Sequence, residues 1–269
     1  MKPIPRSYLF VPGDRPERFD KALAAGAHAV ILDLEDAVLP ERKTQARAAI
    51  AQWLAGAQTS VFLRINPAGT PWHLEDCALL AAASVRGVMA PKAEDAPTLQ
   101  AIAARLRQDQ ELIPLVETVA GHFEALALAR VPRVSRLAFG SVDFMTDSGI
   151  EGDAAELDAV RTHLVLVSRQ AGLQAPIDGV SLVIDDARQV EDDARRSRRL
   201  GLGAKLCIHP RQVAPVHAAF APSPAEIAWA RRVLEALASG PLGAIAVDGK
   251  LVDKPVALRA QGILEQLAQ

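Results

Sequence analysis

The chain has 269 residues and a formal charge of −2, so it presents no overall electrostatic field that would attract nucleic acid or an anionic membrane surface. Half of its residues are hydrophobic but only 4% are aromatic, which predicts a core packed from Ala, Leu, Val and Ile. No apolar run approaches the roughly 18 residues of a membrane span, and strand-like sequence by Tyr8 leaves no room for a signal peptide. Two well-separated cysteines, Cys77 and Cys207, argue against a disulfide framework and favour the cytoplasm.

Short apolar runs recur along the chain, and each is followed by a polar cluster. They cover residues 8–11, 29–32, 61–63, 87–90, 112–116, 137–139, 177 and 205–208. The stretches between them are long enough for helices, so the pattern predicts parallel βαβ units. Eight such units in about 250 residues predict a closed (β/α)8 TIM barrel. In such barrels the residues that follow the strands carry the chemistry.

The pattern changes near residue 240, where Ser239-Gly240-Pro241 interrupts it. Apolar stretches at 245–247 and 251–252 flank Asp248-Gly249, which is a strong signal for a two-residue β-hairpin turn. A last helix is expected over about 255–267. We therefore expect a catalytic barrel over residues 1–238 and a C-terminal hairpin-helix lid, with a role in oligomerisation, over residues 239–269.

Two carboxylates are candidate metal ligands. Glu117 and Asp143 follow the fifth and sixth apolar runs, so a closed barrel would place them on neighbouring strands at one rim. A solvated or salt-bridged rim carboxylate is the alternative for either one alone. Mg²⁺ commonly takes one or two protein carboxylates and fills its other positions with water and substrate oxygens. Because no His or Cys cluster competes, we predict a hard ion, Mg²⁺ or Mn²⁺.

Arg64 follows the third run, and its guanidinium would project toward the barrel mouth. There its planar fork could stabilise an enolate or carboxylate oxygen. The alternative is a buried arginine that pairs with Glu35 or Asp36. The acidic cluster Asp33, Glu35 and Asp36 could supply a base, or it could hold Arg64 and metal-bound waters, which is the role we favour.

Eight segments, taken in chain order, resemble the signatures of a known family. They are RSYLFVPGDRPERF (6–19), VILDLEDAV (30–38), FLRINPAGT (62–70), GVMAPKAED (87–95), LIPLVETVAG (112–121), LAFGSVDF (137–144), AKLCIHPRQV (204–213) and AVDGKLVDKPV (246–256). Together they resemble the citrate lyase beta subunit and its malyl-CoA and citramalyl-CoA lyase relatives in the HpcH/HpaI aldolase superfamily. The resemblance implies that Glu117 and Asp143 bind Mg²⁺ and that Arg64 and Glu117 contact substrate. It also implies that the C-terminal segment crosses to a neighbouring subunit, where Asp253 acts as a catalytic acid, in a homotrimer or hexamer with shared active sites.

The resemblance further implies a reaction that cleaves or condenses a β-hydroxyacyl-CoA thioester, with a small keto acid and acetyl- or propionyl-CoA as the other components. Arg64 would face the enolate oxygen, and Glu35 and Asp36 are further catalytic candidates. Candidate substrate contacts are Phe10, Arg18, Lys21, Lys43, Arg47, Ile208 and His209. Glu17 stands where relatives that use free CoA can carry a lysine. The alternatives are a beta subunit that acts on carrier-bound citryl groups only in a multi-subunit complex, a binding or regulatory paralogue, and a barrel of the phosphoenolpyruvate type.

Overall fold

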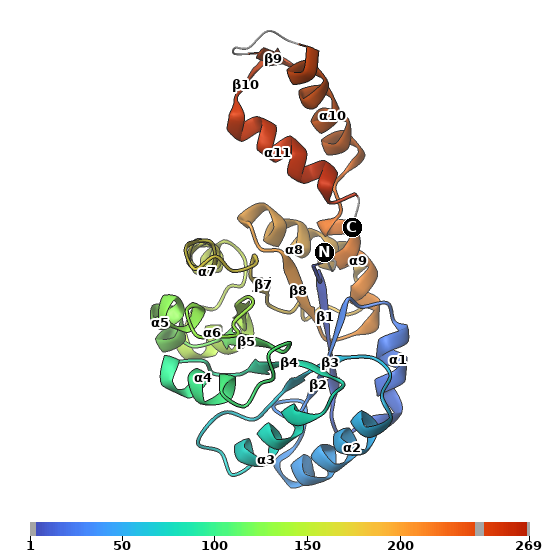
Figure 1. Cartoon of the computed structure of the whole chain (residues 1–269), viewed down its shortest axis with the longest axis vertical. Helices are drawn as coiled ribbons and strands as arrows, with labels where there is room; N and C mark the ends of the chain where they lie inside the picture. The colour runs from blue at the N-terminus through green and yellow to red at the C-terminus, as the bar shows by residue number, and fades with distance from the viewer. Residues whose placement is uncertain (1–3, 240–244, 268–269) are drawn as a thin grey trace. The chain divides into compact units, whose positions relative to one another are not determined.

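A closed barrel of parallel strands forms the larger part of the chain (Figure 1). The computed structural model describes residues 4–239 and 245–267. The strands are β1 (Ser7–Pro12), β2 (Ala29–Asp33), β3 (Val61–Arg64), β4 (Val85–Ala90), β5 (Glu111–Val116), β6 (Ala138–Phe139), β7 (Ile177–Asp178) and β8 (Ala204–Cys207), each paired with the next, and β8 pairs with β1. The predicted (β/α)8 barrel is confirmed, and each apolar run of the sequence became one strand.

Helices lie between the strands and surround the barrel (Figure 1). They are α1 (Phe19–Ala24), α2 (Lys43–Gly56), α3 (His73–Ala78), α4 (Ala96–Ala103), α5 (Val119–Ala129), α6 (Ser141–Ser148), α7 (Asp158–Gln170), α8 (Ala187–Leu200) and α9 (Val213–Phe220). Their ends follow local chemistry. Asp95 caps α4 by accepting a hydrogen bond from the Thr98 N–H, and α8 ends at Gly201, whose φ of +99° suits glycine. Five 3₁₀ turns complete the connections: Pro16–Arg18, Pro40–Arg42, Leu79–Ala81, Ala155–Leu157 and Pro210–Gln212.

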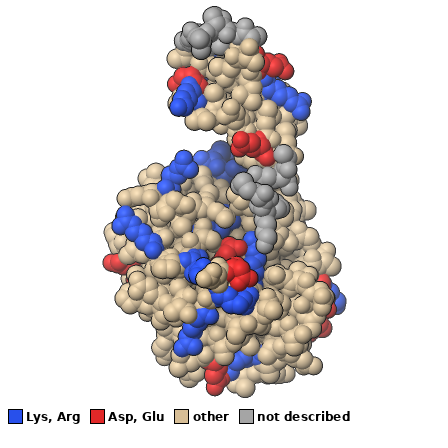
Figure 2. Space-filling model, in the orientation of Figure 1, with Lys and Arg blue, Asp and Glu red and all other residues tan. Residues whose placement is uncertain are grey.

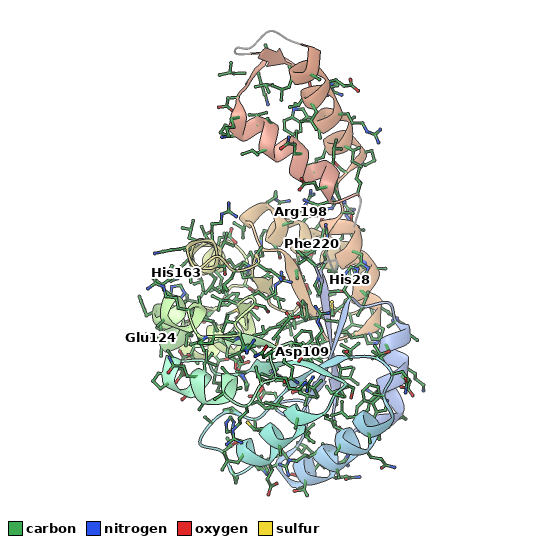
Figure 3. All side chains as sticks on the ribbon, viewed as in Figure 1. His28, Asp109, Glu124, His163, Arg198 and Phe220 are labelled. Carbon is green, nitrogen blue, oxygen red and sulfur yellow. The ribbon has the colours of Figure 1, made fainter. Side chains whose placement is uncertain are left out.

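Side chains fill the barrel interior (Figure 3). The buried cluster inside the barrel comprises Tyr8, Ala29, Ile31, Phe62, Met89, Ile113, Leu115, Ala138, Ile177, Ala204 and Leu206. Arg136 lies beneath this cluster, fully buried, and donates hydrogen bonds to the carbonyl oxygens of Pro5 and Ala175 and to the Tyr8 hydroxyl. Because Pro5, Arg136 and Ala175 all precede their strands, these contacts close the N-terminal end of the barrel. A ligand site is therefore expected at the opposite, C-terminal end.

The residues from Ala219 onward belong to a second compact unit, whereas the barrel unit comprises Pro5–Ala218. The second unit contains α10 (Pro224–Ser239), the antiparallel hairpin β9 (Ile245–Val247) and β10 (Lys250–Val252), and α11 (Lys254–Glu265). Asp248 and Gly249 both have positive φ, 51° and 73°, as a primed hairpin turn requires, so the predicted hairpin is confirmed. The expected boundary at residues 238/239 assigned α10 to the barrel, whereas α10 and α11 share one apolar core that includes Ala230, Val233, Val252, Ala260 and Ile263.

The surface carries both signs of charge. Lys and Arg side chains lie beside Asp and Glu side chains on the visible face of the barrel unit (Figure 2). Within the described part of the chain, no helix combines the length and the apolar character that a membrane span requires.

Candidate active site at the barrel mouth

Strand pairing brings the predicted site residues together. β2 and β3 pair in a register that makes Asp33 and Arg64 direct neighbours. β5 and β6 are also neighbours, and the Gly140 N–H donates to the Val116 carbonyl oxygen at 2.9 Å, just before Glu117. Because all eight strands are parallel, the residues after their C-terminal ends meet at a single rim.

A cavity of about 230 Å³ opens at this rim. Its polar wall includes Asp33, Arg64, Glu117 and Asp143, and its apolar wall includes Phe10, Leu115, Val180, Leu182, Leu206 and Ile208. A largely apolar pocket with a few converging charged groups is the usual form of a small-molecule site. Of the predicted substrate contacts, Phe10, Arg64, Glu117 and Ile208 line this cavity.

Arg64 is held from two sides. Its Nε and Nη2 donate to the two carboxylate oxygens of Asp33 at 2.7 and 2.6 Å, and its Nη1 lies 2.9 Å from Glu35 Oε2. The guanidinium also stacks over the Phe10 ring at 4.6 Å. Burial by itself lowers the pKa of Arg64, but Asp33 and Glu35 outweigh it and the net shift is upward, so the group stays charged. Of the five N–H donors of an arginine, these contacts leave about two for a ligand in the cavity.

Asp33 is the residue that fixes Arg64. It is fully buried, and besides the two Arg64 bonds it accepts hydrogen bonds from the backbone N–H groups of Glu35 at 2.9 Å and Ala37 at 3.2 Å. Asp36 plays a smaller part, since its carboxylate is 58% exposed and 3.8 Å from Arg64 Nη1. The pairing that we weighed as an alternative for Arg64 is thus present with Glu35, while Arg64 also faces the cavity.

Glu35 is a buried carboxyl with an unusual proton affinity. Burial raises its pKa to about 8, against the opposing effect of Arg64 and with a further contribution from nearby Glu117. Its Oε2 lies in ion-pair range of Arg64 but makes no hydrogen bond. A carboxyl that exchanges its proton near neutral pH is suited to general acid–base chemistry.

Glu117 and Asp143 meet through a third residue, Lys92, which follows β4. The Lys92 backbone N–H donates to Glu117 Oε1 at 2.7 Å, and its Nζ donates to Asp143 Oδ1 at 3.2 Å. Glu117 is 1% exposed, and burial raises its pKa to about 7 despite the contacts with Lys92. Gly140 leaves room for this side chain, because a Cβ there would lie 2.5 Å from Glu117 Cβ and 2.7 Å from Glu117 Oε2.

The donor set fits magnesium. Glu117 and Asp143 supply hard carboxylate oxygens, which Mg²⁺ prefers to nitrogen or sulfur. Within the residues that the structure describes, no group of three or more His, Cys, Asp or Glu side chains could hold a metal ion by itself. Two carboxylates suffice for Mg²⁺ when water and substrate oxygens complete its shell. His163 lies on α7 (Figure 3), and its ring contacts that of His122.

The remaining predicted residues have other contacts. Lys21 is exposed on α1. His209 is the N-cap of the 3₁₀ turn Pro210–Gln212, and its Nδ1 accepts a hydrogen bond from the Arg211 N–H at 3.2 Å. The backbone N–H groups of Ile208 and His209 both donate to Gln212 Oε1, at 2.8 and 3.3 Å. Their N–H groups are therefore engaged within the protein.

Lys43 and Arg47, two of the candidate substrate contacts, instead bind other residues of the protein near the rim. Lys43 Nζ is buried and donates to the carbonyl oxygens of Leu34 and Glu35, both at 2.9 Å. Arg47 Nε donates to Asp76 Oδ1 at 2.8 Å. Asp253 belongs to the C-terminal unit, where it is exposed and caps α11 by accepting from the Val256 N–H at 3.1 Å. Its role as a catalytic acid stays a prediction.

Sequence reasoning missed two contributors to the site. Lys92 follows an apolar run as the other candidates do, so applying the strand-end rule to every strand would have included it. Gly140 gave no such signal, because the close approach of Glu117 is visible only in three dimensions.

The chain is similar in sequence and in fold to known proteins. The model of the HpcH/HpaI aldolase/citrate lyase family matches residues 6–210. A citrate lyase subunit beta-like protein of Mycobacterium tuberculosis is 36% identical over 97% of this chain and 95% of its own length. An L-malyl-CoA/beta-methylmalyl-CoA lyase of Cereibacter sphaeroides is 32% identical, over 97% of this chain and 94% of its own. A crystal structure of CitE from M. tuberculosis, in complex with magnesium, acetoacetate and coenzyme A, superposes with a TM-score of 0.88 at 33% identity and covers all of both chains. The chain belongs to the HpcH/HpaI aldolase/citrate lyase family.

Proposed function

We propose that the chain is a Mg²⁺-dependent carbon–carbon lyase that cleaves, or in reverse condenses, a β-hydroxyacyl-CoA thioester, with a small keto acid and acetyl- or propionyl-CoA as the other components. The observation that carries the proposal is that Arg64, Glu117 and Asp143 line one cavity of about 230 Å³. Relatives support it: one is a malyl-CoA lyase, and one was crystallised with magnesium, acetoacetate and coenzyme A.

The residues divide the chemistry among them. Mg²⁺ held by Glu117 and Asp143 would polarise the substrate oxygens that it binds. When the bond between the hydroxyl-bearing carbon and the thioester α-carbon breaks, the hydroxyl loses its proton and the thioester becomes an enolate. Arg64, which lines the cavity and is oriented by Asp33, would stabilise that enolate oxygen. Glu35, whose Oε2 lies 2.9 Å from Arg64 Nη1 and whose pKa is raised to about 8 mainly by burial, would exchange a proton.

We also propose a role for the C-terminal unit. The family resemblance assigns Asp253 to the barrel mouth of a neighbouring subunit, where it would protonate the enolate carbon. Asp253 is exposed, and its carboxylate accepts a hydrogen bond from the Val256 N–H at 3.1 Å, so it is accessible to a ligand. A homotrimer or hexamer with shared sites, coenzyme A contacts by Lys21 and His209, replacement of Mg²⁺ by Mn²⁺, and a cytoplasmic location all stay predictions.

A panel of acyl-CoA substrates tests the function. The purified chain with Mg²⁺ is incubated with malyl-, citramalyl- and 3-hydroxy-3-methylglutaryl-CoA, and the products are identified by mass. We expect an oxo acid together with acetyl-CoA from at least one of them, and no product with Asp143→Asn or with EDTA. Release of free CoA with an intact carbon chain would identify a thioester hydrolase instead. Turnover only of a carrier-bound citryl group would identify the subunit of a complex, and no turnover of either would favour a binding protein.

A further inference from the structure

Lys92 contacts both carboxylates that we assign to the metal, and it does so with different atoms. Its backbone N–H donates to Glu117 Oε1 at 2.7 Å. Its Nζ donates to Asp143 Oδ1 at 3.2 Å and lies 4.0 Å from Glu117 Oε1. A single residue after β4 therefore connects the residues that follow β5 and β6.

The backbone at Lys92 is unusual. Its φ is +45°, in the left-handed region, which few residues other than glycine adopt. Strained backbone of this kind persists where the surroundings hold it in place, and it concentrates at functional sites. Here the strained conformation is the one in which the N–H meets Glu117 while the side chain meets Asp143.

The ammonium group and a divalent cation require the same oxygens. Asp143 Oδ1 and Glu117 Oε1 are the nearest acceptors of Lys92 Nζ, and both belong to the proposed ligand set. The Lys92 and Asp143 side chains are each 39% exposed, and an ion pair with that much solvent around it is weak. The ammonium can therefore move into water when a stronger cation arrives.

We propose that Lys92 is a positioning residue with two functions, in which its backbone N–H orients Glu117 and its ammonium competes with the divalent cation for Asp143 and so sets the metal affinity of the site. This inference rests on the metal site of the proposed function. The competition keeps Mg²⁺ binding weak until substrate oxygens add their own bonds to the ion, so that metal and substrate bind together.

Titration with Mg²⁺ alone tests the inference without any substrate. Isothermal titration calorimetry is applied to wild type and to three variants. K92M removes the charge but keeps the length, K92R keeps the charge, and K92G removes the charge while accepting the positive φ. Since an ion pair with this much exposure changes an equilibrium by about threefold to fivefold, K92M and K92G should bind Mg²⁺ about threefold to fivefold more tightly than wild type. K92R should stay within about twofold of wild type.

Thermal unfolding supplies an independent readout. Without Mg²⁺, K92M should melt below wild type because two carboxylates lose their shared counter-ion, and its Tm should rise more than that of wild type on adding Mg²⁺. Unchanged or weaker Mg²⁺ binding in both K92M and K92G overturns the competition, as does a K92R variant that behaves like K92M. If K92M binds Mg²⁺ more weakly than wild type but K92G does not, the strained backbone at residue 92 sets the metal affinity. That result also overturns the proposed competition. The assay is separable from the lyase test: tighter binding by K92M supports the inference even if no acyl-CoA is cleaved.

Discussion

Replacing Asp33 with asparagine tests whether a buried carboxylate fixes the position of Arg64. Asp33 is fully buried and accepts hydrogen bonds from Arg64 Nε, Arg64 Nη2 and the backbone N–H groups of Glu35 and Ala37. Asparagine keeps the shape but has one acceptor oxygen, and its NH₂ group would face donors. It also removes the negative charge beside a buried guanidinium.

The magnitude follows from the loss of one partner of a buried ion pair. Such a loss costs about 3–5 kcal/mol, because the remaining charge is left uncompensated. We therefore expect Asp33→Asn to lower the free energy of unfolding by about 3–5 kcal/mol. Asp36→Asn is the matched control: that carboxylate is 58% exposed and 3.8 Å from Arg64 Nη1, so its loss should cost about 0.5 kcal/mol or less.

Urea denaturation followed by tryptophan fluorescence measures the effect in the barrel unit. The chain has three tryptophans, and a Trp229→Phe background leaves Trp53 and Trp72, which both lie in the barrel. A loss below about 1 kcal/mol for Asp33→Asn would refute the reasoning. The double variant Asp33→Leu with Arg64→Met should cost less than the sum of its single changes, since it leaves no unpaired charge.

Four further changes probe the site. Arg64→Lys keeps the charge but loses the fork, so kcat should fall roughly 10²–10³-fold; a changed KM with normal kcat would make Arg64 a binding residue only. Gly140→Ala should displace the Glu117 carboxylate, because the new Cβ would lie 2.7 Å from Oε2, and calorimetry should show weaker Mg²⁺ binding, unlike in a Gly56→Ala control, where the new Cβ meets nothing within 4 Å. Since burial raises the pKa of Glu117 to about 7 and the proton competes with the metal, Mg²⁺ affinity should fall as the pH drops through 7; a flat profile from pH 8 to 6 would contradict this. Asp253→Ala and Arg64→Ala should each be nearly inactive, yet mixed oligomers of the two should recover part of the activity; failure of confirmed mixed oligomers to recover any would remove the shared site.

The raised pKa values also affect stability, and the sign can be worked out. Glu35 has a pKa of about 8 in the folded chain, mainly because of burial, against an ordinary value of 4.5. Between these values the folded chain holds the proton more tightly than the unfolded chain does, so this group's contribution is present at low pH and is lost as the pH rises toward 8. The Glu35→Gln variant, which cannot titrate, should therefore show a smaller loss of stability from pH 6 to 8 than wild type.

The barrel and most of its rim were predictable from the sequence. Short apolar runs that alternate with helix-length stretches determine a parallel barrel, because parallel strands buried on both faces must be apolar along their length. Barrel geometry then places the residues after each strand at one end, which is how Arg64, Glu117 and Asp143 could be named together. The hairpin in the C-terminal unit was also predictable from local sequence, because Asp248-Gly249 suits a turn that needs positive φ.

Only the tertiary structure determined which partners these residues have. The sequence grouped Asp33, Glu35 and Asp36 in one acidic cluster and named only Glu35 and Asp36 as catalytic candidates, but the register of β2 against β3 places Asp33 beside Arg64, and Asp36 is 58% exposed. The assignment of α10 to the C-terminal core depended likewise on which apolar faces meet. Such choices depend on contacts between residues distant in sequence, and on the burial that those contacts create. Burial is what raises the proton affinity of Glu35 and Glu117, and it cannot be assigned to a carboxylate before the fold has placed it.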